Sequence, residues 1–84
     1  IDPLAFTTSH LAIIGCGAIG RQLALACSQL PLGSLTLVDP DTVSPENLGP
    51  QGYGPSDISH PKPTICARDC SLRNPDLPIH TLPT

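Results

Sequence analysis

The sequence contains no tryptophan and no methionine, and it has a single tyrosine and a single phenylalanine. With so few aromatic rings, a hydrophobic core has to be built from Leu, Ile, Val and Ala side chains. Charged residues are also scarce, at 13% of the 84 residues, against roughly 25% in an average domain. A surface with so little charge is expected to be covered in part, by the rest of a longer chain or by a partner.

Clusters of basic residues and long apolar runs are missing too. Four scattered cations, Arg21, Lys62, Arg68 and Arg73, sit in a chain of net charge −3. Nucleic acid is therefore not an expected partner, because polyanion binding needs dense Lys and Arg. No apolar run approaches the ~20 residues of a membrane span, and the first residues lack the basic region of a signal peptide. We expect a cytoplasmic protein with neither a nucleic-acid nor a membrane partner.

The cysteines do not predict a disulfide framework. Their positions, Cys16, Cys27, Cys66 and Cys70, match neither the spacing of secreted disulfide proteins nor a CxxC zinc pair. A reducing compartment fits this usage, and we expect no metal site. The pattern favours small buried thiols rather than reactive ones.

Apolar runs and helix-spaced residues alternate along the chain. Strands are predicted at residues 10–15, 34–38 and 77–82, and helices at residues 18–29 and 57–74, the second beginning near 61–63. The first helix is indicated by apolar residues at helical spacing, namely Ile19, Leu23, Ala26 and Leu30. The βαβ–loop–αβ order predicts an α/β fold, a Rossmann-like parallel sheet of three strands with helices on both faces. We expect residues 1–84 to form a single unit, which is a fragment of a longer domain.

Residues 40–60 differ from the rest in being rich in proline and glycine. One helical turn is predicted there, at residues 45–48, where Ser44 can cap a turn that begins with Pro45. A loop this long in so small a domain is usually functional or mobile.

The glycines of the first strand–helix connection form a GxGxxG pattern. In that pattern Gly15 permits a tight turn, Gly17 lets the backbone approach a phosphate, and Gly20 lets the helix pack on the strand. The helix N-terminus then offers free N–H groups to an anion. Asp39 ends the next strand, about 20 residues further on, where a carboxylate can accept hydrogen bonds from ribose hydroxyls. The combination predicts a nucleotide site.

The stretch after Asp39 resembles the ThiF/MoeB/HesA family and its relatives, the ubiquitin-activating enzymes. That family has a GxGxxG, a strand ending in Asp-x-Asp, a Val, a Ser-Asn-Leu-x-Arg-Gln segment, and a Lys that opens a helix ending in Asn-Pro. The matching residues are Gly15, Gly17, Gly20, Asp39, Asp41, Val43, Asn47, Leu48, Gln51, Lys62 and Asn74-Pro75. The resemblance covers Leu11 to about Ile79.

The resemblance implies ATP-dependent adenylation of the C-terminal glycine of a ubiquitin-like or sulfur-carrier protein. It implies that Gly15 to Gly20 hold the phosphates and Asp39 the ribose. It places Asn47 and Gln51 at the phosphates, with Lys62 neutralising their charge. Lys62 and Gln51 would thus serve catalysis as well as binding.

The resemblance bears on three further features: the role of Asp41, the Mg²⁺ ligand and the assembly of the protein. Asp41 would orient the loop, although a turn-capping role explains it equally well. The Mg²⁺ ligand of the family would lie outside this chain. The resemblance also implies a homodimer or a longer parent chain.

One departure from the family pattern bears on activity. Pro50 occupies the position of a phosphate-binding Arg, and proline carries no charge and donates no hydrogen bond. Arg21 is the nearest substitute, but a solvent-exposed helix residue is the simpler interpretation. Whether the chain is an enzyme therefore stays open. The alternatives are the NAD-binding half of an oxidoreductase and a non-catalytic recognition domain for a ubiquitin-like partner.

Overall fold

A computed structural model describes residues 9–49 and 51–82. The elements in chain order are β1 (His10–Ile14), α2 (Ala18–Cys27), β2 (Ser34–Val38), the short 3₁₀ helices η1 (Pro45–Asn47) and η2 (Pro55–Asp57), α3 (Lys62–Arg73) and β3 (Ile79–Leu82). All three predicted strands and both predicted helices are therefore present. The bounds predicted for β2 and the predicted start of α3 near 61–63 agree with the structure, whereas the predicted ends of the other elements are too long by one or two residues.

The sheet is entirely parallel, in the order β1-β2-β3. Leu11 and Ile13 of β1 lie opposite Leu35 and Leu37 of β2, and Leu37 in turn lies opposite Thr81 of β3. The Rossmann-like parallel sheet predicted from the sequence is confirmed.

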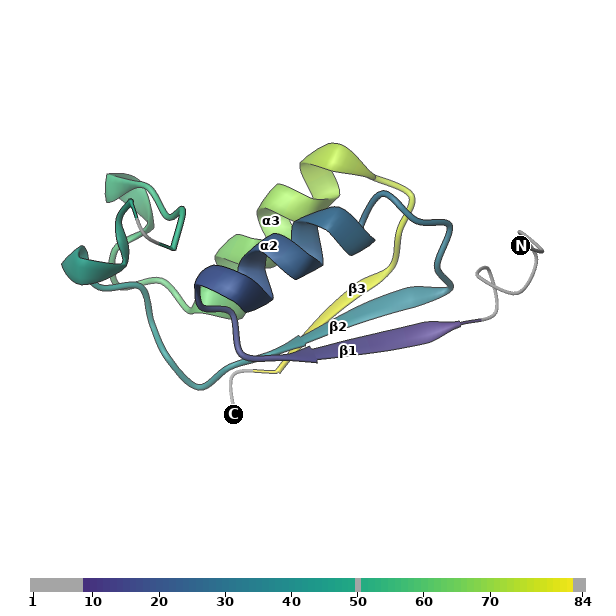
Figure 1. The fold of residues 1–84 in the computed structure, drawn as a ribbon, viewed down its shortest axis with the longest axis horizontal. Helices are drawn as coiled ribbons and strands as arrows, with labels where there is room; N and C mark the ends of the chain where they lie inside the picture. Colours follow the sequence, from purple (N-terminus) through teal and green to yellow (C-terminus); the bar gives the residue numbers. More distant parts are fainter. Residues whose placement is uncertain (1–8, 50, 83–84) are drawn as a thin grey trace.

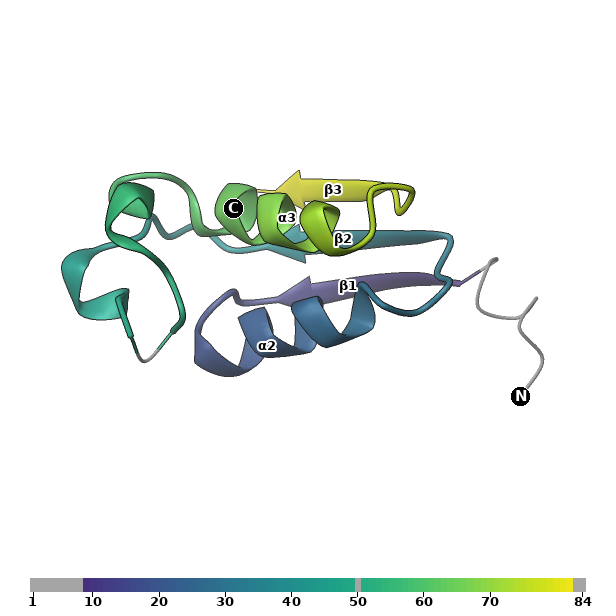
Figure 2. The same ribbon diagram turned by 90° about the horizontal axis from the view of Figure 1, so that it is seen from above.

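The two helices lie side by side on one face of this sheet (Figures 1 and 2). Both crossovers step in the same direction across the sheet, and right-handed crossovers then place their helices on the same side. The expectation of helices on both faces is not met within residues 9–49 and 51–82. On the opposite face Ile14 is 76% exposed and Leu82 is 50% exposed.

The main core fills the space between the sheet and the two helices. Its buried members are Ile13, Cys16, Ala24, Leu35, Leu37, Cys66, Cys70 and Leu77. The first helix does not contribute the side chains expected of it: Ile19 is 85% exposed and Leu23 is 50% exposed, whereas Ala24 faces the core. The periodicity therefore predicted the helix correctly, but the stripe that defined it points away from the sheet.

Residues 39–49 and 51–61, the 39–61 extension, lie beyond the carboxyl ends of the strands (Figure 1). A second small core of Val43, Tyr53 and Ile65, flanked by Leu48 and Ile58, stabilises it. Ser44 lies at the N-cap of η1 as expected, and its backbone N–H donates to Asn47 Oδ1 at 2.8 Å. Pro50 lies outside the described residues.

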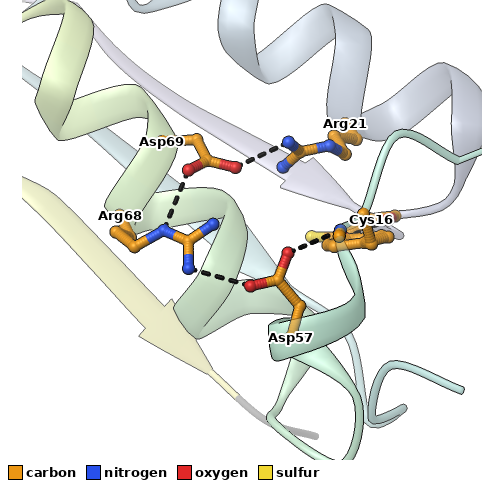
Figure 3. Close-up of polar contacts among 7 residues, drawn as sticks. Cys16, Arg21, Asp57, Arg68 and Asp69 are labelled. Carbon is orange, nitrogen blue, oxygen red and sulfur yellow. Dashed lines mark hydrogen bonds and ion pairs between the residues drawn. The ribbon is translucent and has the colours of Figure 1, made fainter. Parts of the chain in front are cut away.

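A ladder of charged side chains ties this extension to both helices (Figure 3). Arg68 of α3 donates to Asp57 of η2 at 2.8 Å and to its neighbour Asp69 at 2.9 Å. Asp69 also pairs with Arg21 of α2 at 2.6 Å. The Asp57 side chain is only 4% exposed, whereas that of Arg68 is 49% exposed, so the ladder holds the loop to α3 at the edge of the fold.

Two kinds of site are not found within the described residues. No group of three or more His, Cys, Asp or Glu side chains there could hold a metal ion. Nor does any helix in that part of the chain have the length and apolarity to cross a membrane.

The Asp57 contacts predict an acid dependence of folding stability. Arg68, together with the Gly54 N–H, holds the pKa of the Asp57 carboxyl below its ordinary value. A depressed folded-state pKa adds stability above the unfolded value of about 4, and this is lost as the pH falls through the folded pKa. Urea unfolding between pH 7 and pH 3 should therefore show a smaller loss of stability with falling pH in Asp57→Asn than in the wild type.

Asp76→Asn, in the exposed turn before β3, provides the control for removing a carboxylate elsewhere. An Asp57→Asn variant with the same acid dependence as the wild type would contradict the assignment.

Candidate functional site

The strand–helix connection at Gly15–Gly20 can be built only with glycine at two positions. Gly15 has a φ of +96°, a left-handed conformation that disfavours other residues. A Cβ on Gly20 would lie 1.9 Å from the carbonyl oxygen of Gly15, so the first turn of α2 packs directly on the turn. Gly17 is the N-cap of α2, and it leaves the first N–H groups of the helix at the carboxyl end of β1 (Figure 1).

The Cys16 residue between these glycines is held at both backbone groups. Its N–H donates to Asp39 Oδ2 at 2.7 Å, and its carbonyl accepts from the Tyr53 hydroxyl at 2.6 Å. The second oxygen of Asp39 accepts the N–H of Asp41 at 2.9 Å. Asp39 thus joins the glycine loop to the start of the 39–61 extension, and an ionised carboxylate still has lone pairs left for a ligand.

Tyr53 was not singled out by the sequence, although it is the only tyrosine in the chain. Burial raises the pKa of its hydroxyl above the ordinary value, so the group stays protonated and remains a donor to Cys16. Its position in a loop rich in proline and glycine gave no signal of a contact with residue 16.

Cys16 is an inert member of the site. It is fully buried, as are the thiols of Cys66 and Cys70 beneath it. A hydrogen bond with Cys66 holds the pKa of Cys16 below its ordinary value and raises that of Cys66 to about 11. The expectation of small buried thiols agrees with this packing.

A polar hollow of about 320 Å³ opens on the 39–61 extension, which Asp39 joins to the glycine loop. Its lining residues are Asp41, Thr42, Ser44, Glu46, Asn47 and Lys62. Three residues that the sequence singled out separately, Asp41, Asn47 and Lys62, are therefore brought together. The backbone N–H of Lys62 donates to the carbonyl of Asp41 at 3.0 Å, which fixes the start of α3 against the loop.

Lys62 is the cation of this hollow, and it is buried, at 6% exposure. Within residues 9–49 and 51–82 its ammonium group makes neither an ion pair nor a hydrogen bond. The exposed Glu46 carboxyl is close enough for Lys62 to contribute to lowering its pKa, after hydrogen bonds to its own backbone and to Ser44. Lys62 therefore brings a positive charge to a hollow that Asp41 and Glu46 also line.

Asn47 and Gln51 lie in different places. Asn47 Oδ1 is occupied by the Ser44 N–H and hydroxyl, so its free group toward the hollow is the amide nitrogen. Gln51 is not among the lining residues. Its side chain lies over the glycine loop, where a Cβ on Gly17 would come 3.7 Å from Oε1. That oxygen is buried and has no partner in the described part of the chain.

Arg21 is not the exposed helix residue expected from the sequence. It is 8% exposed, pairs with Asp69 and lies 4.6 Å over the Tyr53 ring. The sequence alone did not indicate that position 21 faces inward on α2 rather than outward.

The sheet is parallel, and its carboxyl ends carry a glycine loop, an acidic residue after β2 and a buried cation. These features are typical of the α/β folds that bind nucleotides. The ThiF family matches residues 4–84. The chain belongs to this family.

Solved structures of known proteins share the fold. E. coli MccB, crystallised with ATP, superposes with a TM-score of 0.91 at 22% identity and covers 98% of this chain. E. coli tRNA N6-threonylcarbamoyladenosine dehydratase, TcdA, in complex with AMP, gives 0.90 at 23% identity over 98% of this chain. The protein PaaA gives 0.87 at 26% identity over 96% of this chain.

The similar region is a small part of those proteins. This chain spans 25% of the MccB chain, 34% of TcdA and 25% of PaaA. Among curated proteins, no sequence matches this chain.

The two inner glycines should respond differently to alanine. Gly20→Ala places a methyl group at 1.9 Å from a backbone oxygen, so we expect a loss of several kcal/mol of folding stability or no fold at all. Gly17→Ala meets only the Gln51 side chain at 3.7 Å, an ordinary contact, and should change stability by less than about 1 kcal/mol. Circular dichroism with urea unfolding checks both, and equal stability losses would contradict the geometry.

Proposed function

We propose that this chain is the nucleotide-binding part of an ATP-dependent adenylyltransferase, which activates the C-terminal carboxylate of a ubiquitin-like or sulfur-carrier protein. The observation that carries the proposal is Lys62, which has no ion pair among the described residues and lines a polar hollow on the extension that Asp39 joins to the glycine loop. Membership of the ThiF family supports it, as do an MccB crystallised with ATP and a TcdA with AMP.

The residues present fit ATP. Gly17 carries no Cβ at the start of α2, so phosphate oxygens can approach the helix N–H groups, which favour negative charge. Asp39 is fixed by two backbone N–H groups and keeps lone pairs for ribose hydroxyls. Lys62 would supply a positive charge to the phosphates from the wall of the hollow.

The remaining site residues would orient the nucleotide. Asn47 offers its amide nitrogen as a donor from the wall of the hollow, and Asp41 sets the loop through its backbone contacts with Asp39 and Lys62. Gln51, with an unpartnered Oε1 over Gly17, would turn toward the phosphates. ATP would supply the adenylyl group and the pyrophosphate leaving group, with Mg²⁺ held by a ligand outside these residues.

Two alternatives differ in what they require of the hollow. An NAD-binding half of an oxidoreductase uses the glycine loop and Asp39, but nothing in it requires Asp41, Asn47 and Lys62 around one cavity. A non-catalytic recognition domain is favoured by Pro50 in place of the family's arginine. The carrier protein, the homodimer or longer parent chain and the cytoplasmic location are further parts of the proposal that rest on the sequence.

Isothermal titration of the intact protein with ATP·Mg²⁺ and with NAD tests the proposal. We expect saturable binding of ATP and much weaker binding of NAD. Lys62→Gln should raise the Kd for ATP by about tenfold or more, since hydrogen bonds to charged groups contribute about 1.5–3 kcal/mol.

Arg73→Gln, on the exposed end of α3, is the matched loss of one cation and should leave the Kd unchanged. A preference for NAD, or equal Kd values in Lys62→Gln and the wild type, would overturn the proposal.

A further inference from the structure

The side of the glycine loop that faces away from Asp39 is supported by three side chains from three different elements. Tyr53, from the 39–61 extension, donates its hydroxyl to the Cys16 carbonyl at 2.6 Å. Arg21, from α2, lies over the Tyr53 ring at 4.6 Å from its centroid. Asp69, from α3, binds Arg21 Nη2 at 2.6 Å.

These contacts are built into the fold rather than added at its surface. The Arg21 and Asp69 side chains are 9% and 18% exposed, and Tyr53 is 4% exposed. Gly52 makes room for the arginine: it has a φ of +78°, and a Cβ there would lie 3.2 Å from Arg21 Nε. A guanidinium is the cation suited to this place, because it is planar, stacks on an aromatic ring and pairs with a carboxylate at its edge.

The Cys16 residue is the only one in the described part of the glycine loop whose backbone is held by side chains on both sides. The Asp39 bond orients its N–H, and the Tyr53 bond orients the peptide that it shares with Gly17. Because the carbonyl of the Cys16–Gly17 peptide is held by Tyr53, that peptide cannot flip, and the direction of the Gly17 N–H is fixed. Preorganised N–H donors bind an anion without the loss of freedom that a mobile loop would suffer.

We propose that Tyr53, Arg21 and Asp69 form a positioning network that fixes the glycine loop in its anion-binding conformation and couples it to α3, the helix that begins at Lys62. The inference rests on the proposed nucleotide-binding function. It assigns Arg21 no contact with the nucleotide: the residue acts through Tyr53. Loss of any member should loosen the loop and weaken nucleotide binding together.

The test compares Tyr53→Phe with the wild type in the intact protein, by amide hydrogen exchange at Cys16 and Gly17 without nucleotide and by the Kd for ATP·Mg²⁺. Phenylalanine keeps the ring under Arg21 and removes only the hydroxyl. Losing one hydrogen bond of ordinary net strength should speed local exchange and raise the Kd by about fivefold each. Leu35→Val, a core change on β2, is the control for a general loss of stability and should leave the Kd unchanged.

Two further variants separate positioning from direct contact. Arg21→Met should reproduce both effects of Tyr53→Phe, and Arg21→Lys should restore part of each, because lysine keeps the charge for Asp69 but not the planar stacking. Asp69→Asn should also loosen the loop and raise the Kd. If Arg21 instead contacted the nucleotide itself, Arg21→Met would raise the Kd without changing exchange at Cys16 and Gly17.

The outcomes distinguish this inference from the proposed function. If the wild type binds no ATP, the proposed function is wrong. If loop exchange is nevertheless faster in Tyr53→Phe, the network remains the support of the loop. Unchanged exchange together with an unchanged Kd in Tyr53→Phe would overturn the network.

Discussion

The carboxylate of Asp39 makes the pair of hydrogen bonds on which the rest of the site depends. One oxygen holds the Cys16 N–H of the glycine loop, and the other holds the Asp41 N–H at the start of the long extension. Because Asp39 is itself buried at the carboxyl end of the central strand, both segments are set relative to that strand. A buried carboxylate is tolerated here because charged acceptors bind backbone N–H groups strongly.

The extension after Asp39 then behaves as a second small unit rather than a loop in the ordinary sense. Its own core of Val43, Tyr53 and Ile65 includes a side chain of α3, so the extension cannot move independently of that helix. The Asp57–Arg68 contact adds a charged tie between the same two segments. The consequence for the site is that Lys62, at the start of α3, is placed by the same contacts that place Tyr53 against the glycine loop.

The sequence predicted the parts of this arrangement that depend on local patterns. Apolar runs located the strands, Pro45 and Ser44 located η1, and the glycines located the turn before α2, since each of these reflects the backbone preferences of a few adjacent residues. The family resemblance brought Asp41, Asn47 and Lys62 into view, and the fold gathers these three around one hollow. Gln51 was predicted to lie at the phosphates, and its side chain lies over Gly17 of the glycine loop rather than in the hollow.

Positions that depend on tertiary packing were not predictable in the same way. Helical spacing alone could not tell that Ile19 and Leu23 face outward while Arg21 faces inward, because arginine is normally an exposed residue. Both helices lie on one face of the sheet because of the order of the strands. No residue pattern in the chain specifies that order. The contact between Tyr53 and Cys16 joins residues far apart in the sequence and has no local signature at either end.

The buried charged residues of the fold differ in whether a residue of opposite charge pairs with them, and this difference bears on function. Arg21 and Asp57 are each buried against partners of opposite charge, which offsets the loss of hydration and makes them structural. Lys62 has no ion-pair partner among the described residues, and it lines the polar hollow of the extension. Its charge is therefore left for a ligand, and the proposed function assigns it to the phosphates of the nucleotide.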